Sequence, residues 1–370
     1  MSNILRYRST HSGRLERWLG KEQLADISSN MKGWYYNPIH LLNCPGSVRV
    51  SADGDFIGPF EHGVFMSAVD SLECAVKRAL KTPKYSFNTG FTSISDALSR
   101  GSGGFSRKFP FNKAGPTGVV AVTTSLHKVG AQPIAGAASA APPGGTAFVD
   151  SDTGGFTFDN PAAGSYRLTG ADVVADRVST LLLYDRIFGV AKTPSSVSTE
   201  AVTGDPTRYQ STTATAEDYI GGNFGFIEVG TAALGATAHN WTVCLYEDEA
   251  AASSTLPTVT GNSGAIAHRL DQPASTWFVP LASGDRGIRA WTQLQNSASV
   301  TGAVDFVIGH PLGFMTLPLI NGWFPFDWLT NRDQAPRIFA DAYLAFLDLT
   351  KVATNATNFN GVFYMTSTSS

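Results

Sequence analysis

Three short stretches carry residue types that perform chemistry in other proteins, and each lacks part of the pattern that the chemistry needs. Asp150-Ser151-Asp152 with Gly154 is similar to the opening of a calcium loop, but the later ligands and the closing glutamate are missing. Gly261-Asn262-Ser263-Gly264 is one residue short of the nucleophile elbow of serine hydrolases. The glycine-rich run 101–104 leads into Phe105 instead of a helix start, so we expect no phosphate cradle there.

Histidines and carboxylates are also poorly grouped for catalysis. The seven histidines stand alone and show no metal-ligand spacing; they are His11, His40, His62, His127, His239, His268 and His310. The acidic run Glu247-Asp248-Glu249 is typical of a solvated loop, with metal binding or an ion pair to a partner's arginine as the alternatives. An enzyme would have to use Asp271, Asp285 or Asp305, the only nearby carboxylates, and Asp305 stands among apolar neighbours. The sequence thus predicts no catalytic residue, no cofactor and no metal site.

Composition narrows the classes of partner. Charged residues make up 15% of the 370 residues, against roughly 25% in an average protein, and the net charge is -3. Such a chain has no electrostatic footprint for nucleic acid, and no run of about 18 apolar residues predicts a membrane span. No secretory signal is visible, and Cys44, Cys74 and Cys244 are too far apart for a disulfide framework. We therefore expect protein partners and a reducing, cytosolic site of synthesis.

The C-terminal part, residues 147–370, reads as a mainly β domain, an antiparallel sandwich or jelly roll. The segment Ser275–Gly309 reads as a hairpin-like unit at the centre of a sheet, because apolar and polar residues alternate from Ile288 to Gln295 and again from Val304 to Ile308. Further strands are expected at 180–190, 223–229, 241–246, 276–281, 287–295, 300–308, 343–349 and 361–365. The segment 180–190 also satisfies a helical pattern.

The N-terminal part, residues 1–146, reads as an irregular region with one or two helices. The apolar spacing favours helices at 13–31 and 64–80, and one strand at 118–126. The Gly-, Ala- and Pro-rich run 130–145 is typical of a linker or a surface loop. Scattered aromatic residues without a sustained period indicate an arm that lies along a neighbouring subunit.

Clustered aromatic residues are the better functional clue. The density around Trp323 exceeds what a loop can hide, so these side chains form either a second core layer or an intersubunit contact. The interface candidates are Arg6, Arg8, Trp18, Trp34, Tyr35, Tyr36, Trp323, Phe324, Phe326 and Trp328. A carbohydrate- or receptor-binding sandwich would instead expose Trp241, Trp277, Trp291 and Tyr246.

The segment 180–230 resembles structural proteins of tailed-bacteriophage virions, and so does the Gly-, Ala-, Ser- and Thr-rich composition of the chain. The segment reads TLLLYDRIFGVAKTPSSVSTEAVTGDPTRYQSTTATAEDYIGGNFGFIEVG. The resemblance implies a capsid decoration or cement protein, located in the virion and assembled in the host cytoplasm. Its partners would be capsid or other virion proteins and further copies of itself, with a trimer favoured and no direct contact with nucleic acid or membrane. A tail or head-tail connector component remains an alternative, as does the receptor-binding sandwich.

Overall fold

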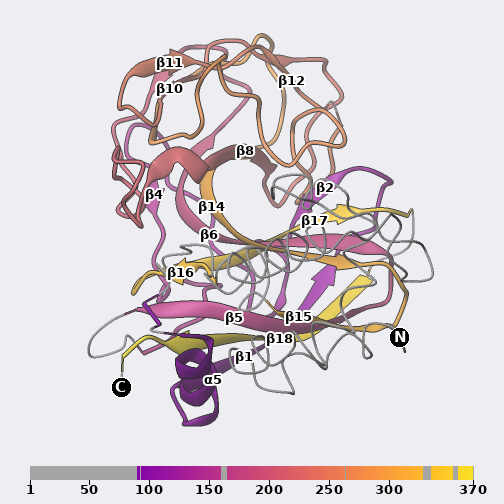
Figure 1. The fold of residues 1–370 in the computed structure, drawn as a ribbon. Coiled ribbons are helices and arrows are strands. Elements are labelled where there is room, and N and C mark those ends of the chain that lie inside the picture. Colours follow the sequence, from indigo (N-terminus) through magenta and orange to yellow (C-terminus); the bar gives the residue numbers. More distant parts are fainter. Residues whose placement is uncertain are drawn as a thin grey trace, which may run out of the picture. The chain divides into compact units, whose positions relative to one another are not determined.

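Two long strands connect the layers of the molecule in the computed structural model (Figure 1). The structure describes residues 90–91, 93–159, 165–262, 264–327, 335–352 and 357–369. Strands β6 (Ser179–Lys192) and β14 (Val304–Leu317) pair antiparallel over nearly their whole length. Bulges between Ile308 and Gly309 and between Pro311 and Gly313 interrupt the register of β14. A bulge bends its strand, so one pair of strands can serve two packing layers.

The central sheet is built around this pair, in the order β2-β17-β6-β14-β8, with β4 also paired to β6. Its other strands are β2 (Thr123–Ser125), β17 (Leu344–Thr350), β8 (Phe224–Val229) and β4 (Thr146–Ala147). Most residues of β6 are buried on both faces, which explains why its sequence shows no clean alternation and also fits a helix.

The outer sheet packs against one half of the central sheet. Its order is β15-β5-β18-β1-β3, with β16 also paired to β5. The strands are β15 (Trp323–Asp327), β5 (Tyr166–Ala175), β18 (Thr357–Ser367), β1 (Ser106–Gly115), β3 (Ala131–Gln132) and β16 (Arg337–Ile338). Phenylalanines fill the space between the sheets, as in the ring pair of Phe111 on β1 and Phe346 on β17, 4.6 Å apart. The two sheets therefore form a sandwich with an aromatic core.

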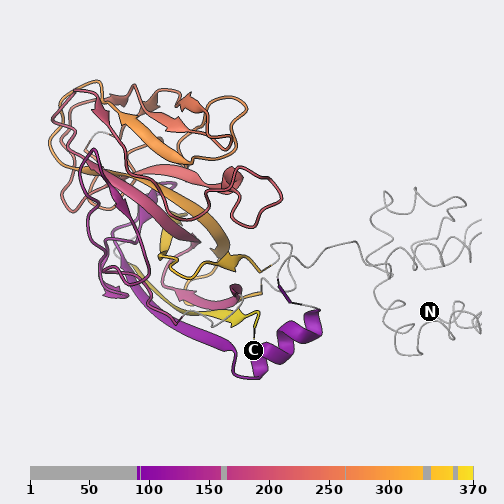
Figure 2. The same ribbon diagram turned by 90° about the vertical axis from the view of Figure 1, so that its left-hand side faces the viewer.

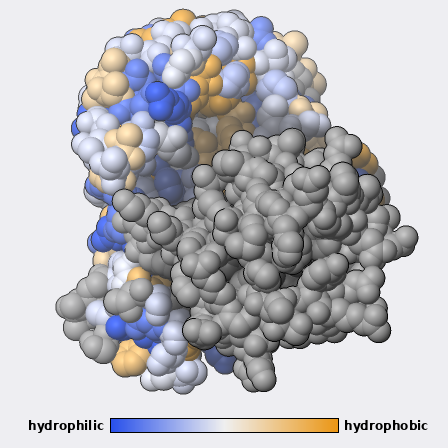
Figure 3. Space-filling view, in the orientation of Figure 1, coloured by the Kyte–Doolittle hydropathy of each residue, from blue (hydrophilic) through white to orange (hydrophobic). Residues whose placement is uncertain are grey.

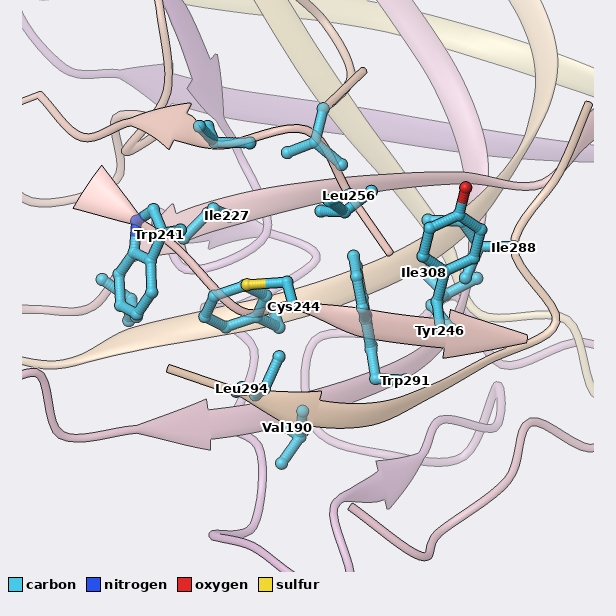
Figure 4. Close-up of a cluster of buried hydrophobic side chains, with 14 of the residues drawn as sticks. Val190, Ile227, Trp241, Cys244, Tyr246, Leu256, Ile288, Trp291, Leu294 and Ile308 are labelled. Atoms are coloured by element: carbon cyan, nitrogen blue, oxygen red, sulfur yellow. The ribbon is translucent and has the colours of Figure 1, made fainter. Parts of the chain in front are cut away.

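The distal sheet covers the other half, in the order β11-β10-β13-β7, and a separate two-stranded pair joins β9 and β12. The strands are β7 (Glu200–Ala201), β9 (Asn240–Trp241), β10 (Leu245–Glu247), β11 (Ser253–Thr255), β12 (Val259–Thr260) and β13 (Ala290–Leu294). Figure 4 shows the buried cluster here, with Trp241, Cys244, Tyr246 and Trp291 among aliphatic side chains. Trp241 and Trp291 both contact Phe306 of β14 edge-on, at 4.8 and 5.5 Å between ring centroids.

Two helical elements complete the described part. Helix α5 (Ile94–Ser102) begins at Ser93, whose hydroxyl accepts a hydrogen bond from the Asp96 backbone N–H at 3.1 Å. A single 3₁₀ turn, η1, spans Ile220–Gly222. In the turned view of Figure 2, α5 and the outer sheet lie at one end of the described part and the distal sheet at the other. No helix among the described residues is long and apolar enough to span a membrane.

The predicted fold class is confirmed: the described chain is mainly β, with antiparallel sheets and little helix. The strands expected at 180–190, 223–229, 343–349 and 361–365 correspond to β6, β8, β17 and β18. No strand is assigned at 276–281, and the expected strand at 118–126 is limited to β2.

The hairpin expected within Ser275–Gly309 is wrong. β13 pairs with β10 and β7 in the distal sheet, whereas β14 pairs with β6 and β8 in the central sheet. Trp291 of β13 is fully buried. Alternation predicts that a segment is a strand, but it does not say which strand lies next to it, because pairing depends on contacts that are distant in sequence.

Residues 87–370 form one compact unit, and the boundary expected at 146/147 stays a prediction. β1 and β3 belong to the outer sheet, and β2 belongs to the central sheet. The run 130–145 is tied down as well, since the Ala191 backbone N–H donates to Ala140 O at 2.9 Å. The helices expected at 13–31 and 64–80 lie outside the described residues.

Candidate functional site

An exposed group of apolar side chains marks the connection from β14 to β15. We call it the β14–β15 corner; it comprises Phe314, Leu319, Ile320 and Trp323, which are 48%, 63%, 56% and 61% exposed. In Figure 3, most of the coloured residues are hydrophilic or intermediate, and hydrophobic residues occur in small groups. Four large exposed apolar side chains thus occur within ten residues of sequence, and exposed apolar residues of this kind are typical of interaction surfaces.

The corner lies where two sheets end. In the described part of the chain, β15 is the terminal strand of the outer sheet, and β14 beyond Gly309 pairs only with β6 because β8 pairs only with residues 304–309. β14 also contacts β5, the strand next to β15. Terminal strands are places where further chain can add, and Pro325 in β15 limits such pairing because proline has no N–H to donate.

The predicted interface residues separate in the structure. Trp323 is exposed, whereas Phe324 and Phe326 are half-buried and pack against the core between the outer and central sheets. The aromatic cluster is therefore divided between core and surface, as strand alternation requires. The remaining candidates lie outside the described residues; they are Arg6, Arg8, Trp18, Trp34, Tyr35, Tyr36 and Trp328.

The aromatic platform expected of a carbohydrate-binding sandwich is not exposed at three of its four positions. Trp241, Trp291 and Tyr246 are core residues of the distal half. Trp277 is half-buried, with its ring 5.7 Å from that of Phe314 in an edge-to-face contact. Trp241, Trp291 and Tyr246 thus fill the interior instead of presenting flat faces to a sugar.

Charged side chains are buried at several points of the central sheet and are paired there. The fully or nearly buried ion pairs are Arg177–Asp348, Arg186–Glu228, Lys128–Asp305 and Arg208–Asp185. Pairing is needed because a lone charge in a dry interior costs several kcal/mol, on the order of the whole stability of a domain. Asp305, an isolated carboxylate in the sequence, thus belongs to an ion-pair network.

Four of these groups form a cluster that we call the Lys128 cluster, made of Lys128, Arg186, Glu228 and Asp305. Arg186 donates to Glu228 Oε2 at 2.8 Å, and its Nη2 lies 3.6 Å from Asp305 Oδ2, to which Lys128 Nζ donates. Burial raises the pKa of Glu228, but Arg186 and Lys128 outweigh it and hold the pKa at about 2. Two positive and two negative charges therefore balance inside the protein.

Sequence reasoning singled out Asp305 and missed its partners. The signal was present: Arg186, Glu228 and Asp305 each interrupt an apolar strand run that becomes β6, β8 and β14. A charge within a strand buried on both faces needs a partner of opposite sign. Lys128 lies in a loop and carried no such signal.

Three of the described histidines, His127, His239 and His310, pack closely against other side chains. Burial lowers the pKa of His127 and of His310 to about 3, and both rings pack against tyrosines, His310 stacking on Tyr209 at 3.8 Å. The His239 Nε2 pairs with Asp271 Oδ2 at 2.8 Å, and this hydrogen bond raises the pKa of His239. The same carboxylate oxygen accepts from Trp241 Nε1 at 2.9 Å.

The residues of the calcium-loop-like opening and of the acidic run make local hydrogen bonds. Asp152 Oδ2 accepts from the Val149 backbone N–H at 2.9 Å, an arrangement that stabilises a turn. One ligand oxygen each of Asp248, Glu249 and Asp285 lies within 4.8 Å of the others, and each side chain also accepts a hydrogen bond. Asp248 accepts from the Ala250 and Ala252 backbone, Glu249 from the Arg286 backbone and Asp285 from Tyr246.

Comparison with known proteins adds little. No family model matches the chain, and no curated protein matches it. Among solved structures, the chain has a weak similarity to the crystal structure of the infectious bursal disease virus VP2 subviral particle. The similarity has a TM-score of 0.15 and 8% identity, and it covers 71% of this chain and 80% of that chain. A TM-score this low carries no argument about fold or function.

Proposed function

We propose that this chain is a structural component of a phage virion, which binds and stabilises the capsid through subunit–subunit contacts. The β14–β15 corner is the observation that carries the proposal, because four large apolar side chains are exposed there within ten residues of sequence, next to the last described strand of the outer sheet. Burying them against another protein removes apolar surface from water at about 25 cal/mol per Å². The role is mechanical: contact area between subunits raises the barrier to rupture of the shell.

A homo-oligomer is the expected form of such a component, since symmetric assemblies repeat the same contact many times. We expect the purified chain to be a closed oligomer, with a trimer favoured, and to sediment together with empty capsids. Light scattering gives the solution mass, and co-sedimentation gives capsid binding. A monomer that stays in the supernatant would overturn the proposal.

The corner can be tested with a matched pair of isoleucines. Ile320 is 56% exposed at the corner, and Ile134 is 59% exposed beyond β3, at the opposite edge of the outer sheet. We expect Ile320→Ser to weaken assembly and Ile134→Ser to leave it unchanged. Trp323→Ala should weaken assembly more, about 30-fold if the indole contributes about 2 kcal/mol as an aromatic anchor. Equal behaviour of the two isoleucine variants would argue against the corner as the contact.

A tail or head-tail connector component would use the same surface chemistry. Copy number per virion separates the two roles, because a decoration protein follows the number of capsid subunits and a connector occurs only at one vertex. Quantitative mass spectrometry of purified virions measures this ratio.

A further inference from the structure

The Lys128 cluster brings an amine and a carboxyl group into direct contact inside the protein. Lys128 Nζ donates to Asp305 Oδ2, and each side chain is only 3% exposed. Lys128 follows β2 in a loop, whereas Asp305 lies in β14, 177 residues further along the chain. A bond between them would tie two distant parts of the central sheet together.

The neighbours of this pair supply what amide formation needs. Glu228 lies directly opposite Asp305 in the β8–β14 ladder; its Oε1 has no hydrogen-bond partner among the described residues. Arg186 Nη2 also has no hydrogen bond and lies 3.6 Å from Asp305 Oδ2. The Glu228 carboxylate can accept and return a proton once Lys128 has lost its charge, because that removes one of the cations that lower the pKa of Glu228. A guanidinium can stabilise negative charge that develops on the attacked carboxyl group.

We propose that Lys128 and Asp305 react spontaneously to form an intramolecular amide cross-link between Nζ and Cγ. The step is a dehydration in which nothing is oxidised or reduced. A proton moves from Nζ to the Asp305 carboxylate, which leaves the net charge of the cluster unchanged. The neutral amine then attacks Cγ, and the C–N bond forms.

Glu228 takes the second proton from the nitrogen and passes it to the departing hydroxyl. The C–O bond breaks and one water molecule leaves. Arg186 stabilises the oxyanion of the tetrahedral intermediate. Two buried charges are replaced by one neutral amide, and the released water leaves the dry interior, so both changes favour the product.

The first test is the intact mass of the purified full-length chain, measured after denaturation. The cross-link predicts a mass about 18 Da below that of the linear chain, the mass of the water lost in forming one amide from an amine and a carboxyl group. After digestion, a branched peptide should contain both Lys128 and Asp305. A mass equal to that of the linear chain, with both residues in separate linear peptides, would overturn the inference.

Variants locate the bond. Lys128→Arg keeps the charge but lacks the nucleophile, so we expect the mass deficit to disappear. Lys192→Arg changes another buried lysine, paired with Glu200 at 2.8 Å, and should retain the deficit. Loss of the deficit in both variants, or in neither, would contradict the assignment to Lys128.

Two further variants test the mechanism. An amide carbon also accepts the amine, with ammonia as the leaving group, so cross-linked Asp305→Asn should have the same mass as the cross-linked natural chain. Glu228→Gln cannot accept the proton and should leave most of the chain linear while its sheet signal in circular dichroism is kept. A full mass deficit in folded Glu228→Gln would exclude the proton-transfer role of Glu228.

Discussion

Buried titratable residues make the stability of this protein depend on pH. Burial holds the pKa of His127 and His310 at about 3, against 6.5 for an exposed histidine, and Arg186 adds to the effect at His127. Between pH 6.5 and 3 the unfolded chain therefore binds protons that the folded chain does not. These two histidines therefore lower the free energy of unfolding as the pH falls through this window, whereas His239, Asp185 and Asp348, whose pKa values are raised, act in the opposite direction.

We expect the urea midpoint to decrease from pH 7 to pH 5 and again to pH 4. Glu228, with its pKa of about 2 instead of 4.5, extends the loss to still lower pH, because its stabilising effect is present above pH 4.5 and disappears below it. His310→Gln is the control. Its stability deficit relative to the natural chain should shrink as the pH falls, and a constant deficit would refute the assignment to His310.

The buried ion pair Arg177–Asp348 should be costly to break on one side. Both side chains are fully buried, and Asp348 also accepts from Ser179 and Thr350. Asp348→Ala leaves an unpaired guanidinium in the interior, which should lower the free energy of unfolding by about 3–5 kcal/mol. Arg286→Ala, which removes an exposed partner of Glu249, should cost less than about 1 kcal/mol in the same urea titration. Similar losses would contradict the importance of burial.

At the scale of elements, the contact between β8 and the distal sheet depends on a glycine. A Cβ at Gly225 would lie 2.6 Å from Ile288 Cδ1 and 2.7 Å from the Trp291 ring, too close for either to stay in place. Gly225→Ala should therefore cost about 1–3 kcal/mol through overpacking. Gly101→Ala in α5 meets open space and should be neutral or stabilising by up to about 1 kcal/mol. Thermal unfolding of both variants measures this difference in stability. An unchanged melting temperature of Gly225→Ala would show that β8 and the distal sheet can move apart without loss of stability.

At the scale of the whole molecule, we expect a deletion at the N-terminus to affect assembly and stability to different degrees. If the N-terminal region reaches neighbouring subunits, deletion of residues 1–30 should weaken co-sedimentation with capsids more than it lowers the melting temperature. Light scattering and calorimetry on the same preparation measure the two effects. Parallel loss of both would mean that this region supports the fold of its own subunit.

The residue pattern alone was enough for the fold class and for most strand positions. Runs such as 180–190 and 343–349 are rich in large apolar residues, and their length and flanking turns indicate strands. Period and length are local properties, so they can be read without knowledge of the partner strand. The neutral, small-residue composition likewise favoured protein partners, which remains a prediction.

Tertiary structure alone decided which strands are neighbours and which charges meet. β13 and β14 are consecutive in sequence but lie in different sheets. β14 pairs with β6 in the central sheet, whereas the short β13 lies in the distal sheet and covers the distal core. Trp323 is exposed and Phe324 half-buried because they point to opposite faces of β15. Lys128 and Asp305 meet across 177 residues through sheet packing, and no local pattern encodes a contact of that separation.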